Sequence, residues 1–193
     1  MSRVISITLA AAFALAVCFQ AALGATSYPP VSFNDLVSRA DVIFVGDVVD
    51  VRPFLLTTRT GTIIKTRVVF RVSDPLFGTT SSVEVFDFLG GEVGDVGMAV
   101  AEMPTFAVGD RRIVFARRTR GINPIVGFRQ GLLRIGRDGS GVDRVTTLEG
   151  VPVAQPQDIG IRAEGPVRPL VSAMRLSDFR DRVARALAAA GRR

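Results

Sequence analysis

The sequence predicts a mainly β, antiparallel fold with one short helix before the strands and a second helix at the C-terminal end. Three observations support this fold class. Thr62 to Ser73 alternates apolar and polar residues with a period of two, as a strand with one buried face does. Arg111 to Ile135 contains two apolar runs separated by the polar stretch Thr119 to Pro124, which is typical of a hairpin. Further short apolar runs between these segments are bounded by glycine, proline or aspartate.

The remaining elements follow from local signals. Ser32 is predicted to cap a short helix, because Asp35 follows it at capping-box spacing and apolar residues recur at helical spacing. Gly46 is predicted to mark a bulge or a sharp coil in the strand Asp41 to Arg52. The residues from Glu92 to Gly109 are rich in glycine and acids and predict a long loop. Further strands are expected at Ser82 to Leu89, Val142 to Leu148 and, as a short edge strand, Pro104 to Val108.

The chain has 193 residues, of which 48% are hydrophobic and 22% charged, and this composition fits one globular domain. We expect a β domain over 25–149, an irregular surface strap rich in proline and glycine over 150–175, and a helix over 176–191 that packs on the domain. Ser177 is the expected cap of that helix. Its apolar face should comprise Phe179, Val183 and Leu187, and its solvated basic face Arg180, Arg182 and Arg185.

Residues 1–24 have the layout of a secretory signal peptide. Arg3 precedes the apolar run Val4 to Val17, and Ala22-Leu-Gly24 forms a site of small residues before Ala25. We therefore expect an exported protein that is released to the periplasm or the medium, with no membrane attachment after cleavage. An uncleaved anchor and a lipid on Cys18 are the alternatives.

Composition excludes several kinds of chemistry. The sequence has no histidine, and Cys18 is its single cysteine, so histidine-dependent triads and histidine-ligated zinc are excluded. Lys65, the single lysine, lies on the polar side of a predicted strand, where an activated lysine is not expected. We predict no catalytic residue, no cofactor and no metal site, with hard-cation binding by the acidic loop as an open alternative.

Charge is unevenly distributed along the chain. Val72 to Asp110 contains seven acids and no base, whereas Arg111 to Arg137 contains eight arginines and no acid. The first segment contributes Glu92, Asp95 and Glu102 to a predicted recognition rim, and the second contributes Arg117, Arg118 and Arg120. Simple neutralisation between neighbouring strands is the alternative. The net charge of +6 favours anionic partners in general, but scattered arginines, one tyrosine and no tryptophan do not predict a specific nucleic-acid binder.

The segment Ala40 to Val48, Ala-Asp-Val-Ile-Phe-Val-Gly-Asp-Val, follows a predicted helix and precedes a long strand that ends at Gly78. This arrangement resembles the netrin-like module, the OB-type barrel of tissue inhibitors of metalloproteinases. It is still more similar to a group of bacterial exported proteins of unknown activity, which share this start and a later Phe-x-x-Gly-[Asp/Glu] step. Here that step is Phe106-Ala-Val-Gly-Asp110.

The resemblance implies a closed barrel of five or six strands flanked by two helices, and a partner such as a secreted protease. The inhibitory chemistry of the family is not carried over, because its N-terminal cysteine is missing and Phe77 stands where the family usually has lysine. The function expected is a non-enzymatic binding or inhibitor-like module. A carboxylate-dependent hydrolase using acids such as Glu84, Asp87, Glu92 and Glu102, and a structural envelope protein, are the alternatives.

Overall fold

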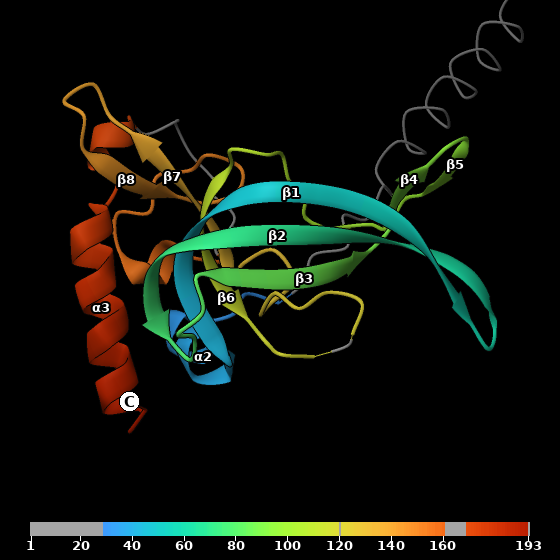
Figure 1. The fold of residues 1–193 in the computed structure, drawn as a ribbon. Coiled ribbons are helices and arrows are strands. Elements are labelled where there is room, and N and C mark those ends of the chain that lie inside the picture. Colours follow the sequence, from blue (N-terminus) through green and yellow to red (C-terminus); the bar gives the residue numbers. More distant parts are fainter. Residues whose placement is uncertain (1–28, 120, 161–168, 193) are drawn as a thin grey trace, which may run out of the picture.

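The computed structural model describes residues 29–119, 121–160 and 169–192 (Figure 1). Six strands form one sheet in the order β3-β2-β1-β6-β7-β8, and every neighbouring pair is antiparallel. The predicted mainly β, antiparallel fold is thereby confirmed. The strands are β1 (Val42–Thr58), β2 (Gly61–Phe77), β3 (Val83–Leu89), β6 (Arg111–Ala116), β7 (Leu132–Arg137) and β8 (Asp143–Thr146). The predicted signal peptide 1–24 and Arg120 lie outside the described residues.

Two helices and a small hairpin complete the fold. Helix α2 (Phe33–Arg39) has Ser32 as its N-cap, as predicted, with the Asp35 N–H 3.1 Å from the Ser32 hydroxyl. Helix α3 (Leu176–Ala189) has Arg175 as its N-cap, two residues before the predicted cap Ser177, whose hydroxyl bonds Asp178 instead. The hairpin consists of β4 (Gly91–Val93) and β5 (Val96–Met98), and the strap contains the 3-10 helices η1 (Pro156–Asp158) and η2 (Leu170–Ser172).

The sheet is covered on both faces. On one face α2 and α3 pack against it, and the rings of Phe33, Phe115 and Phe179 lie 5.8 to 6.4 Å apart, mutually edge-on. On the other face Phe44, Phe70 and Phe86 form a second core. Successive residues of a strand point to opposite faces, so the segments covered on both faces, 42–45 of β1 and 113–116 of β6, are apolar throughout.

β1 coils strongly along its length. Its register against β2 shifts between Val45 and Gly46, which confirms the bulge predicted at this glycine. The sheet nevertheless remains open in strand order, with β3 and β8 at its two ends. In the described parts of the chain no strand pairing joins these ends, so the OB-like, netrin-type barrel stays a prediction.

Three predictions differ from the structure because apolar residues fill the core without joining the sheet. The strand expected from Ile125 begins at Leu132, and Ile125 forms one isolated bridge with Ala116. No strand forms over residues 104–108, where the Phe106 ring packs 4.7 Å from that of Phe88. The strap does not lie wholly on the surface, since its side chains Val153, Ile159 and Ala173 are buried.

Candidate functional site

The acids of the predicted rim lie in two places. Glu92 on β4 and Asp95 in the β4–β5 turn are exposed, and neither forms an ion pair with any described residue. Glu102 instead pairs with Arg129 at 3.5 Å, and Arg129 also contacts Glu149 at 3.0 Å. Of these three acids, only Glu102 is therefore held by an ion pair to a described residue.

The arginines of the rim have a different environment. Arg118 donates two hydrogen bonds to the Glu84 carboxylate on β3, and its backbone N–H donates to the Asp41 carboxylate at 2.8 Å. Arg117 is exposed and has no ion pair within the described chain, and Arg120 lies outside it. Among the predicted rim residues that the structure describes, no ion pair joins an acid to an arginine.

Glu84, Arg129 and Glu149 take part in these contacts but were not among the predicted rim residues. A signal for Glu84 was present, because the alternation in Val83 to Phe88 places it on the same face as Phe86 and Phe88. A carboxylate on a core face requires a partner. Nothing in the sequence indicated which of the arginines that partner would be.

The most distinctive surface is the projecting end of β1 and β2, residues 53–64, which we call the β1–β2 arm (Figure 1). Both strands run for 17 residues, longer than predicted. β6 pairs with β1 only up to Asp47, and β3 reaches β2 only from Lys65 onward. The arm is therefore a two-stranded ribbon that extends past the rest of the sheet.

Both faces of the arm carry leucine. Leu55 lies opposite Ile64 and Leu56 opposite Ile63 in the pairing of the two strands. Leu55 is 54% exposed and Leu56 is 38% exposed. Ile64, by contrast, is buried, because β4 covers its face near the base of the arm, where a side chain added at Gly91 would meet Ile64. The hairpin thus supports the arm and leaves the leucines accessible.

The arm and its base are cationic. Between Asp50 and Asp74 the chain has five basic residues and no acid. Arg52, Arg67 and Arg71 pair with acids nearby, at distances of 2.8 to 3.8 Å. Arg59 in the turn and Lys65 have no ion pair with a residue that the structure describes. The arm therefore combines two exposed leucines with the unpaired charge of exposed Arg59, and half-buried Lys65 adds a second charge at its base.

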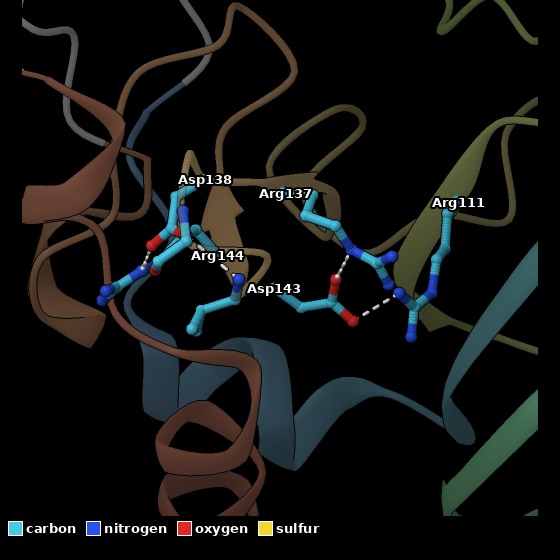
Figure 2. Close-up of polar contacts among 7 residues, drawn as sticks. Arg111, Arg137, Asp138, Asp143 and Arg144 are labelled. Atoms are coloured by element: carbon cyan, nitrogen blue, oxygen red, sulfur yellow. Dashed lines mark hydrogen bonds and ion pairs between the residues drawn. The ribbon is translucent and has the colours of Figure 1, made fainter.

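A polar network holds the other end of the sheet together (Figure 2). Asp143 accepts hydrogen bonds from Arg111 at 2.5 Å and Arg137 at 3.3 Å, which joins β8 to β6 and β7. Burial acts to raise the pKa of the Asp143 carboxyl, but the two arginines outweigh it and the pKa lies below its ordinary value. This pair of contacts stabilises the sheet rather than presenting a reactive group.

Asp138, in the turn between β7 and β8, is held still more firmly (Figure 2). Its carboxylate accepts hydrogen bonds from the Ser140 hydroxyl, from Arg144 and from the Val142 N–H, and these contacts hold its pKa well below the ordinary range. Arg144 also donates to the Ala173 carbonyl at 2.8 Å. The turn therefore fixes Arg144 against the strap.

The acids considered for hydrolysis do not converge. Glu84 pairs with Arg118, Asp87 pairs with Arg67, and Glu102 pairs with Arg129. Within the described ranges, no cluster of three or more histidine, cysteine or acidic side chains is placed to hold a metal ion. None of the helices in those ranges is long and apolar enough to cross a membrane. The comparisons with known proteins found no matching family model, curated protein or solved structure.

Proposed function

We propose that this protein is an exported, non-enzymatic binding module that recognises a partner protein through the β1–β2 arm. The exposure of Leu55 and Leu56 on a projecting ribbon carries this proposal. An isolated two-stranded ribbon is only marginally stable in water, and large apolar side chains that stay exposed on it are typical of a surface that a partner covers. Burial of the two leucines in a complex would explain both why the ribbon projects and why its leucines are exposed.

The chemistry of the arm defines the partner. A complementary surface has an apolar recess for the leucines, edged by carboxylates that face Arg59 and Lys65. A secreted protein such as a protease is the class of partner that fits an exported module. The threonines that flank the leucines, at positions 57, 58, 60 and 62, provide hydroxyl groups for the polar rim of such an interface.

We further propose that the scaffold is an OB-like barrel of netrin type. Two contacts near the ends of β3 support this proposal: the Arg118 pair with Glu84, and a hydrogen bond of 2.9 Å from the Leu89 N–H to the Ile122 carbonyl. The segment after β6 therefore touches the outer side of β3, where a closing strand lies in a barrel.

The function is tested with an arm variant, Leu55→Thr combined with Leu56→Thr, which keeps a high strand propensity. Val83→Thr combined with Val85→Thr is the matched control, because these residues are 43% and 48% exposed on edge strand β3. The wild type and both variants are immobilised, and each is exposed to the secretome of the native cells. A captured protein is then purified, and its affinity for each variant is measured.

We expect unchanged melting temperatures for both variants and loss of affinity for the arm variant alone. Arg59→Gln combined with Lys65→Gln should lower the association rate and its dependence on salt. Equal affinity of the wild type and the arm variant would remove the proposed role of the arm.

Export is tested separately. The protein recovered from the periplasm or the medium should begin at Ala25 or within about two residues of it, as the small-residue site before Ala25 indicates. N-terminal sequencing gives the answer directly. Recovery of intact residues 1–24 in a membrane fraction would contradict cleavage.

A further inference from the structure

A cavity of about 500 Å³ lies beside α3, far in sequence from the β1–β2 arm. Its walls come from α3, from the strap around η2, and from Arg144 on β8. This volume falls within the range of small-molecule sites, about 300 to 1,000 Å³, and exceeds what one inorganic ion fills. The cavity is therefore large enough for an organic ligand.

One face of α3 supplies the charged wall. Arg175, Asp178, Arg182 and Arg185 follow one another at intervals of three and four residues, so they share a face of the helix. The apolar face of Phe179, Val183 and Leu187 is buried against the sheet. Arg180 points elsewhere and pairs with Asp74 at 2.7 Å. The predicted basic face is thus divided, and Arg182 and Arg185 lie in the cavity wall while Arg180 does not.

The wall arginines that come from α3 and its cap have no ion-pair partner among the described residues. Arg175, Arg182 and Arg185 form no ion pair within the part of the chain that the structure describes. The two acids in the wall are Asp178 and Asp181, and Asp178 lies in the first turn of α3, where the helix dipole favours a carboxylate. Positive charge is therefore in excess along this wall.

Arg144 is a further lining residue of the cavity, and its guanidinium is held by Asp138 (Figure 2). Its side chain is only 12% exposed, with Nε bonded to Asp138 at 2.8 Å and Nη1 bonded to the Ala173 carbonyl at 2.8 Å. Because these bonds hold the guanidinium in place, its orientation requires no ordering when a ligand binds. The cavity thus combines one preorganised arginine with exposed arginines on the helix.

We propose that this cavity binds a small molecule that carries at least two oxyanion groups, phosphate or carboxylate. Arg182 and Arg185 present the guanidinium forks that match the geometry of such groups. Arg144 lines the same pocket with its charge balanced by Asp138, and Val171 and Met174 offer apolar contact for the carbon frame of the ligand. This site is independent of the partner surface on the β1–β2 arm.

The test titrates the full exported chain with inorganic pyrophosphate and, separately, with citrate, at constant ionic strength in a calorimeter. The two probes distinguish a preference for phosphate from one for carboxylate. Arg182→Gln and Arg185→Gln should each weaken binding about tenfold, the loss expected for one charge-assisted hydrogen bond. Arg39→Gln on α2 is the matched control, because Arg39 is exposed, has no ion pair among described residues and carries the same charge.

Asp181→Asn provides a second test, because it should strengthen binding, whereas a folding defect can only weaken it. Removal of this carboxylate from the wall should tighten the binding of both probes. Failure of the wild type to bind either probe saturably overturns the proposal. Equal weakening by Arg39→Gln and Arg182→Gln also overturns it, because binding would then follow net charge alone.

Discussion

Arg118 and Glu84 are 34 residues apart in the sequence and form a bidentate pair, with Nη1 3.2 Å from Oε2 and Nη2 2.8 Å from Oε1. The Glu84 side chain is 5% exposed, whereas that of Arg118 is 53% exposed. The pair therefore supplies hydrogen bonds to a carboxylate on the core side of an edge strand. It also attaches β3 to the segment that follows β6.

Removal of Arg118 should destabilise the protein measurably. Arg118→Met leaves the Glu84 carboxylate buried without a partner, and we expect a loss of roughly 2 kcal/mol in the free energy of unfolding. Arg117→Met changes an exposed residue with no ion pair among the described residues and should cost under about 0.5 kcal/mol. Urea titration of both variants measures the difference. Equal losses would show that Glu84 finds another donor.

Phe70 and Arg71 test the two faces of β2. Phe70 is fully buried, and its ring lies 5.7 Å from that of Phe44 and 5.8 Å from that of Phe106. Phe70→Ala should cost roughly 3 to 5 kcal/mol. Arg71 contacts Asp47 only at 3.8 Å and is mostly exposed, so Arg71→Ala should cost under about 0.5 kcal/mol. Comparable midpoints of urea unfolding for the two variants would contradict this assignment of faces.

Acidification should weaken the turn between β7 and β8. The folded-state pKa of Asp138 lies below its unfolded value, so its contribution is present above about pH 5 and is lost as pH falls through and below the unfolded pKa. In that window the unfolded chain binds more protons, and stability rises with pH. Asp138→Asn should flatten the dependence of stability on pH between about pH 5 and pH 2.

Asp95→Asn is the control for this experiment, because Asp95 is exposed in the β4–β5 turn and forms no ion pair with any residue described. Its curve of stability against pH should follow that of the wild type. If stability changed with pH as steeply in the Asp138→Asn variant as in the wild type, the acid sensitivity would belong to other carboxyl groups.

Gly78 should tolerate no side chain. Its φ is +69°, and a Cβ there would overlap the carbonyl oxygen of Asp41. Gly78→Ala should therefore cost at least about 2 kcal/mol, from backbone strain and displacement of the chain together. At Gly141 φ is +82° but nothing lies within 4 Å, so Gly141→Ala should cost only about 1 kcal/mol of strain. Thermal unfolding of both variants is the measurement. A larger drop in melting temperature for Gly78→Ala would show the cost of the contact with the Asp41 carbonyl.

The sequence by itself determined what depends on neighbours along the chain. The cap of α2 at Ser32, the bulge at Gly46 and the buried face of β2 follow from short-range periodicity and hydrogen bonding, and the structure contains all three. The absence of histidine likewise restricted the chemistry before any fold was considered. Charge asymmetry left open whether acids of one segment would pair with arginines of the next, and Glu84 and Arg118 do so.

Only the tertiary structure decided which groups meet. The predicted rim grouped Glu92 and Asp95 with Arg118; in the structure Arg118 pairs with Glu84, and the two hairpin acids form no ion pair with a described residue. Ile125 and Phe106 were predicted to lie in strands because they are apolar. They are apolar because they pack against the core, which does not require them to pair in the sheet. The exposure of Leu55 and Leu56 depends on where β3 and β6 end beside two longer strands. The cavity at α3 depends on how the strap meets the helix, and such long-range packing has no local pattern in the sequence.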